Sequence, residues 1–184
     1  MYLHVDNKKM MKNYIITITL ILCAQSVFAQ QDLASRDKFK INNQVCYGDS
    51  RASVISALGS PTREENDYNE MDEVAMLIIF YGDSRISLEN DKLKRFQIKD
   101  TSLSTSYENT TISVGLNVNV LAGLFPNSYG ARGSNVSQYG INPSVIMTLK
   151  AITTGNEERP IDEYVSVLFN PNSQLITEIR HGSW

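Results

Sequence analysis

Cys46 and His181 are two side chains with catalytic potential, and both lie after the apolar N-terminal segment of residues 1–29. A thiol beside an imidazole can act as a nucleophile and base pair. No Asn or Asp spacing suggests a third member, and Cys46 between Val45 and Tyr47 is typical of a small buried residue. After residue 29 these are the only Cys and the only His, and two such ligands cannot complete a zinc site. We therefore expect no catalytic residue, no metal site and no cofactor, and a protein that is not an enzyme.

A second group with chemical potential is acidic and consists of Glu64, Glu65, Asp67, Glu70, Asp72 and Glu73. Carboxylates at this density can bind calcium or dock a basic partner. The alternating Asp and Asn pattern followed by Gly, which marks a calcium loop, is not found in this segment. A solvated loop is the simpler interpretation, and a docking patch is the alternative.

Two tyrosines, Tyr81 and Tyr164, are the candidate protein-binding residues. Val165, Val167 and Phe169 alternate along an expected strand, so Tyr164 points to the other face. Tyr81 ends an apolar run over 74–81, of which one face can be buried against a partner. Tyrosine adds large contact area at interfaces. The alternative is that these rings close a seam between two halves of the protein.

Composition limits the kind of protein this chain can be. It has 184 residues, 42% of them hydrophobic, which suits one compact domain or two small ones. Lys and Arg number 17 against 20 Asp and Glu, so the net charge is −3. That balance excludes a general nucleic-acid binder, which carries a basic footprint.

The N-terminal region has the pattern of a signal peptide over residues 1–29. Lys12 precedes an apolar run from Tyr14 to Ala24, and Val27 and Ala29 fit a cleavage site after Ala29. The run is shorter than the roughly 20 residues that span a bilayer, and no later run is longer. We expect a periplasmic or secreted protein without stable membrane insertion.

Two helices with marked ends are predicted, one in each half of the chain. Ser50 is a good N-cap and Gly59 a good C-terminal residue for a helix between them. Asn117 is the corresponding cap in the second half, after Gly115, and an apolar stripe extends from there to Phe125.

Each helix is followed by alternating segments that predict a three-stranded antiparallel meander. In the first half the strands lie near 74–81, 86–89 and 93–98. In the second half they lie near 145–150, 164–169 and 175–179. Residues 101–106 are short, polar and uncharged, which suits a linker.

We therefore expect an α+β protein of two tandem repeats, each a short helix packed on a three- to four-stranded antiparallel meander. The first repeat would occupy residues 30–100 and the second residues 107–184, joined by the linker over 101–106.

The first helical segment resembles the repeat of the β-lactamase-inhibitor-protein-like superfamily, which also includes small outer-membrane-assembly lipoproteins of the SmpA and OmlA kind. Gly48, Ser50, Val54 and Gly59 match its motif, and Gly115 and Asn117 match in the second half. The resemblance implies a scaffold that binds protein through the open face of its sheet.

These features predict an exported protein-binding module without enzymatic activity. One version is an inhibitor or immunity-type protein that acts on an envelope or extracellular partner. The alternative is a structural or assembly component of a bacterial envelope complex.

Overall fold

The computed structural model describes residues 31–70, 73–132, 143–152 and 157–183. The predicted signal peptide, residues 1–29, lies outside these ranges, as does its expected cleavage point after Ala29. Among the described residues, no helix is long and apolar enough to cross a membrane.

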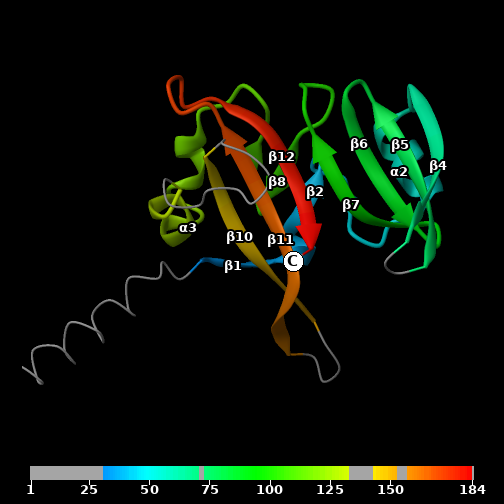
Figure 1. Cartoon of the computed structure of the whole chain (residues 1–184), viewed down its shortest axis with the longest axis horizontal. Coiled ribbons are helices and arrows are strands. Elements are labelled where there is room, and N and C mark those ends of the chain that lie inside the picture. The colour runs from blue at the N-terminus through cyan, green and yellow to red at the C-terminus, as the bar shows by residue number, and fades with distance from the viewer. Residues whose placement is uncertain (1–30, 71–72, 133–142, 153–156, 184) are drawn as a thin grey trace, which may run out of the picture. The chain divides into compact units, whose positions relative to one another are not determined.

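The larger of two sheets has eight strands in the order β1-β10-β11-β12-β7-β6-β5-β4 (Figure 1). Neighbouring strands are antiparallel, except that β1 runs parallel to β10. The strands are β1 (Leu33–Ser35), β4 (Arg63–Asn69), β5 (Val74–Tyr81), β6 (Ser84–Glu89), β7 (Lys92–Ile98), β10 (Ser144–Ile152), β11 (Glu158–Phe169) and β12 (Ile176–Ser183).

A second layer covers one face of this sheet. It contains a four-stranded sheet in the order β3-β2-β8-β9, two α-helices and two short 3-10 helices. The elements are η1 (Arg36–Lys38), β2 (Phe39–Ile41), β3 (Val45–Cys46), α2 (Arg51–Leu58), β8 (Thr105–Tyr107), β9 (Thr110–Ile112), η2 (Val118–Leu121) and α3 (Pro126–Gly130). Figure 1 is seen from the uncovered side, with β2, β8 and α2 behind the large sheet.

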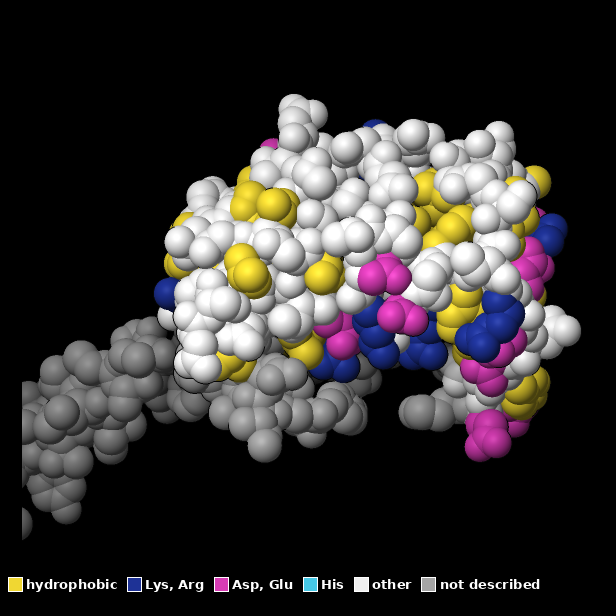
Figure 2. Space-filling model, turned by 90° about the horizontal axis from the view of Figure 1, so that it is seen from above, with side chains coloured by type: hydrophobic (Ala, Val, Ile, Leu, Met, Phe, Trp, Pro, Cys, Tyr) yellow, Lys and Arg dark blue, Asp and Glu magenta, His cyan; other side chains and the backbone are white. Residues whose placement is uncertain are grey.

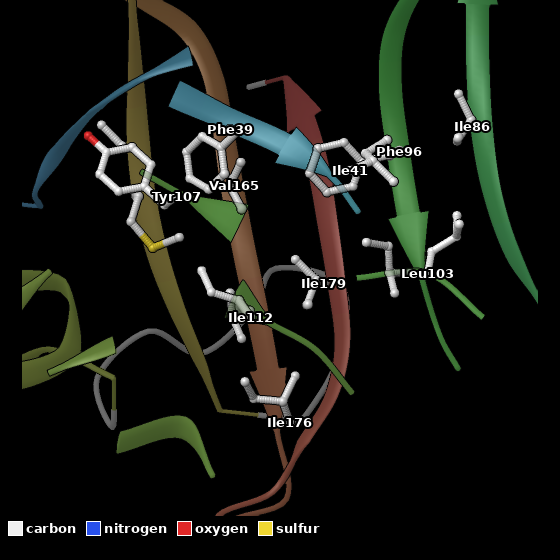
Figure 3. Packing of buried hydrophobic residues seen from close by; sticks show 14 of the residues in the cluster. Phe39, Ile41, Ile86, Phe96, Leu103, Tyr107, Ile112, Val165, Ile176 and Ile179 are labelled. Carbon is white, nitrogen blue, oxygen red and sulfur yellow. The ribbon is translucent and has the colours of Figure 1, made fainter. Parts of the chain in front are cut away.

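The hydrophobic core lies between the two layers (Figure 3). Phe39 on β2 packs against Tyr107 on β8, with ring centroids 4.9 Å apart, and Tyr107 packs on Phe125 at 4.8 Å. Val165 and Ile179 of the large sheet are fully buried in the same cluster. Burial of this apolar surface is the main force that holds the layers together.

Helix α2 confirms the predicted capping residues. The Ser50 hydroxyl accepts a hydrogen bond from the Ser53 backbone N–H at 3.2 Å. Gly59 follows Leu58 with a φ of +86°, a conformation that favours glycine. Val54 is the fully buried residue of this helix.

The second helical segment is shorter than predicted. Asn117 caps it as expected, because its side chain accepts from the Asn119 N–H at 2.9 Å. The segment forms only the 3-10 helix η2, and a separate helix, α3, begins at Pro126. Proline disfavours helical backbone at the residue before it, and Phe125 has a φ of −137°. One continuous helix through Phe125 is therefore disfavoured.

The expected fold of two tandem helix-on-meander repeats is wrong. The predicted strands of both meanders form, but β7 of the first pairs with β12 of the second at Ile98–Ile179 and Gln97–Arg180. The residues from Gln31 onward form one compact unit. Two separate meanders would each leave an edge strand with unpaired backbone groups at this position, and the pairing joins the two edges at these residues.

The cover of the large sheet also differs from the prediction, since it is not one helix over each meander. Strands β2 and β3 precede α2 in the chain, yet β2 pairs with β8. Thr105 and Ser106, at the end of the expected linker over 101–106, belong to β8 and are buried. The protein is thus mostly β, with a shared four-stranded sheet as the main part of its second layer.

The Asp100 carboxylate connects the end of β7 to the turn between β5 and β6. It accepts hydrogen bonds from the Asp83 N–H at 2.6 Å, from the Ser84 hydroxyl at 2.8 Å and from the Ser102 N–H at 2.9 Å. Burial acts to raise the pKa of Asp100, but a hydrogen bond from the Ser102 hydroxyl and the three hydrogen bonds above outweigh it and lower the pKa from 3.8 to about 2.

We expect Asp100→Asn to lower the free energy of unfolding by about 1–2 kcal/mol at neutral pH, because hydrogen bonds to a charged acceptor are lost. The folded-state pKa is lowered, so this contribution is present above pH 3.8 and is lost as the pH falls towards about 2. Urea titrations of both proteins across this range measure the difference. Asp162→Asn, at an exposed position of β11, is the control. A constant difference at every pH would contradict this account of Asp100.

The pairing of β7 with β12 predicts that the described part of the chain unfolds as one unit. Ile179→Ala removes a fully buried side chain at this junction and is expected to cost about 2–5 kcal/mol. Leu175→Ala, at a residue that is 41% exposed, should change the stability by less than about 0.5 kcal/mol. Circular dichroism and tyrosine fluorescence should give one coincident transition, and two separate transitions would contradict the shared sheet.

Candidate functional site

A groove on the uncovered face of the large sheet is the candidate functional site. Its volume is about 400 Å³, and residues of β4, β5, β6, β7, β11 and β12 line it. β12 pairs with β7 only at Ile179 and Arg180, while His181 and Gly182 continue along β11. The groove therefore lies where the two meanders separate beyond their junction.

Three arginines from three strands line this groove: Arg85 on β6, Arg95 on β7 and Arg180 on β12. Arg85 is paired with Gln97, and Gln97 with Arg180, so these residues form one row across the sheet. Strands are about 4.8 Å apart, which places the backbones of Arg85 and Arg180 about 10 Å from each other. Figure 2 shows Lys and Arg side chains gathered at its lower edge, the open side of the sheet, with Asp and Glu beside them.

The acidic neighbour of Arg180 is shared with another hydrogen-bond donor. Nε of Arg180 lies 3.7 Å from Oε1 of Glu178, and the same oxygen accepts a 2.7 Å hydrogen bond from Nε2 of Gln97. Arg95 lies 4.0 Å from Glu89. Among the residues that the structure describes, no carboxylate lies at ion-pair distance from Arg85.

Tyr164 lies on this face, as the alternation along β11 predicts. It is the cross-strand partner of Gly182, and a Cβ atom at residue 182 would lie 2.7 Å from Cζ and from the hydroxyl of Tyr164. The ring therefore lies against the backbone of β12, in space that only a glycine leaves free. Tyr164 and Gly182 both line the groove.

Tyr81 lies on the opposite face of the same sheet and does not meet Tyr164. It is only 7% exposed, belongs to the core cluster, and its hydroxyl donates to the Gly59 carbonyl at 3.0 Å. Burial raises the pKa of the Tyr81 hydroxyl. The ring closes the space between the sheet and the end of α2.

Met76 and Ile78 supply an apolar part of the groove. They alternate along β5 with Leu77 and Ile79, which face the core. The apolar run over 74–81 thus has one face in the core and one on the open side. The groove combines arginines with apolar and aromatic surface, as protein-binding surfaces do.

A cluster of polar and aromatic side chains fills the covered side below the groove. Nε2 of His181 donates to Oε2 of Glu163 at 3.2 Å, and Nη1 of Arg36 lies 3.4 Å from the same oxygen. The His181 ring packs on Tyr47 at 5.0 Å and on Phe96 at 6.1 Å between centroids. His181 and Phe96 also line the groove, so this cluster supports its floor.

Burial acts to raise the pKa of Glu163, but the hydrogen bond and charge of His181 and the charge of Arg36 outweigh it and leave the pKa lowered. Burial holds the pKa of the Tyr47 hydroxyl well above its ordinary value. The Tyr47 hydroxyl and Nδ1 of His181 have no hydrogen-bond partner among the described residues. These buried groups are a costly part of the fold.

Cys46 and His181 do not form the pair that a thiol enzyme needs. His181 is hydrogen-bonded to Glu163, and within the described ranges no hydrogen bond joins it to Cys46. Burial raises the pKa of the Cys46 thiol, and the charge of Asp49 adds to this effect. A raised pKa disfavours the thiolate, which is the reactive form.

The acidic segment does not assemble a metal site in the part of the chain that the structure describes. The expectation of a loop here is wrong for Arg63–Asn69, which form the edge strand β4. Glu64 pairs with Arg51 on α2 at 2.7 Å, and Glu65 pairs with Arg63 at 3.2 Å. Charged side chains on an edge strand discourage pairing with other chains.

The three arginines of the groove were not among the residues predicted from the sequence. The alternation of Ile86 and Leu88 with Arg85 does place Arg85 on the face away from the core. The missing information was the pairing of β7 with β12, which brings Arg180 into the same row.

Comparisons of this chain with known protein families, curated proteins and solved structures found no match.

Glu163→Gln should lower the free energy of unfolding by about 1–3 kcal/mol at neutral pH, because His181 and Arg36 lose a charged partner. The pKa of Glu163 is lowered in the folded state, so the loss should shrink as the pH falls below the ordinary value of 4.5. Denaturant titrations at several pH values test this. The control is Glu108→Gln, which breaks an exposed pair with Lys38 and should cost less than about 1 kcal/mol.

Proposed function

We propose that this chain is an exported, non-enzymatic protein-binding module that contacts its partner through the open face of the eight-stranded sheet. The observation that carries the proposal is the groove itself, which combines Tyr164, apolar side chains and three arginines on a face that no described element covers. Aromatic and arginine side chains are enriched among the residues that dominate binding energy at interfaces.

The strands hold the ring of Tyr164 and the backbones of the arginines in fixed positions. Tyr164 lies against Gly182, and Arg180 shares a row with Gln97 and Arg85. Side chains positioned before binding lose little conformational freedom when a partner arrives, which favours affinity. The face is therefore suited to recognition of a folded surface or of an extended segment.

The non-enzymatic part of the proposal is supported by the surroundings of Cys46 and His181. Burial raises the pKa of the thiol, and the imidazole is bonded to Glu163 in a cluster that supports the fold. Export is supported by the signal-peptide pattern over residues 1–29 and would place the partner in the envelope or outside the cell.

The resemblance to the β-lactamase-inhibitor-protein-like superfamily belongs to this proposal. Its motif residues Gly48, Ser50, Val54 and Gly59 build the start, the buried side and the end of α2. Inhibition of, or immunity against, an envelope or extracellular protein is the version of the function that this resemblance favours.

Tyr164→Ala tests the proposed face. Loss of a central aromatic side chain is expected to cost about 2 kcal/mol of binding free energy or more, so recovery of the partner should fall severalfold. The measurement is chemical cross-linking in envelope extract, followed by affinity capture and quantitative mass spectrometry.

Lys40→Glu is the control for this experiment, because Lys40 is exposed on β2 in the second layer. It should leave recovery unchanged. If every protein captured by the wild-type chain is recovered equally well with Tyr164→Ala, the open face is not the binding surface and the proposal fails.

A further inference from the structure

The charge of the groove is opposite to that of the whole chain. The chain carries a net charge of −3. Arg85, Arg95 and Arg180 line the groove, whereas Asp67 is the one carboxylate among the described residues that line it. Such a local excess of positive charge attracts anionic groups and repels cationic ones.

The guanidinium groups of Arg85 and Arg180 keep donors for a further acceptor. Each arginine has five N–H donors. Arg85 has no ion-pair partner in the described part of the chain, and the Glu178 oxygen nearest to Arg180 already accepts a bond from Gln97. A bound carboxylate would form charge-assisted, bidentate hydrogen bonds with such groups.

The rest of the groove argues for a peptide and against a polyanion. Met76, Ile78 and the ring of Tyr164 provide apolar surface that a phosphate chain cannot use. Glu89 and Glu178 stand beside the arginines and repel dense negative charge. A segment with both acidic and apolar side chains satisfies the arginines and covers the apolar surface.

From these observations we infer that the groove binds an acidic, partly apolar peptide segment of the partner, whose carboxylates pair with Arg85 and Arg180. This inference rests on the proposed function and adds the chemical class of the segment that is recognised. The chain then distinguishes its partner by charge as well as by shape, and the affinity falls as the salt concentration rises.

A phage library of random dodecapeptides is the probe for this inference. Peptides are selected on the purified protein. A counter-selection on the double variant Arg85→Gln, Arg180→Gln then removes peptides that bind outside the groove. We expect the selected peptides to be enriched in Asp and Glu next to apolar residues. No enrichment in acidic residues would overturn the inference.

One enriched peptide is then measured by fluorescence anisotropy. Arg85→Gln and Arg180→Gln should each weaken binding at least about tenfold, as should replacement of the peptide's Glu residues by Gln. Lys40→Glu should leave the affinity unchanged, and circular dichroism reports whether each variant is folded. Equal affinity for the Gln peptide, or stronger binding to vesicles that contain anionic lipid, would overturn the inference.

The two proposals fail in different ways. If partner recovery from envelope extract falls with Tyr164→Ala but not with Arg85→Gln or Arg180→Gln, the face binds protein and the acidic-segment inference is wrong. If recovery is unchanged in all three variants, the proposed binding face itself is wrong.

Discussion

Backbone N–H and C=O groups at the edge of a sheet need partners, and β7 and β12 are the edges that two independent three-stranded meanders would leave open. Pairing of Ile98 with Ile179 and of Gln97 with Arg180 joins the two edges at these residues. Together with β1 and β4 at the outer sides, the six meander strands form one eight-stranded sheet. A sheet of this width needs a wider cover than two short helices provide. The four-stranded sheet formed by β3, β2, β8 and β9 supplies most of that cover.

The same junction creates the candidate site. Beyond Arg180, β12 follows β11 and separates from β7. On the covered side, Tyr47, Phe96 and His181 fill the resulting space, and Glu163 and Arg36 complete the cluster. On the open side the space remains as the groove. The same departure from regular strand pairing therefore determines both the packing of the core at this place and the shape of the groove.

Local signals in the sequence predicted the local structure well. Ser50 and Gly59 mark the ends of α2, and the alternation around Tyr164 correctly assigns it to the face away from the core. These signals act between residues that are near neighbours in the chain. Capping and alternation depend on a few adjacent side chains, so they can be read from the sequence alone.

The pairing between distant segments could not be predicted in this way. Alternation says which face a side chain takes but not which strand lies beside it, so the row of Arg85, Gln97 and Arg180 was not visible. The burial of Tyr81 could not be decided from the sequence for a related reason, since it depends on the position of α2 against the end of β5. β4 was missed because Glu, Asn and Asp are depleted in strands and both of its faces are exposed.

The parallel pairing of β1 with β10 has a consequence for the order in which the fold is completed. Leu33 is joined to Thr148, and Phe39 on β2 to Tyr107, so the earliest described strands find their partners far along the chain. Such distant closures make folding slow compared with local helix or hairpin formation. During synthesis, β1 has no strand to pair with until β10 has left the ribosome, when most of the chain has been made. The edge of the large sheet at β1 is therefore completed only after β10 has been made.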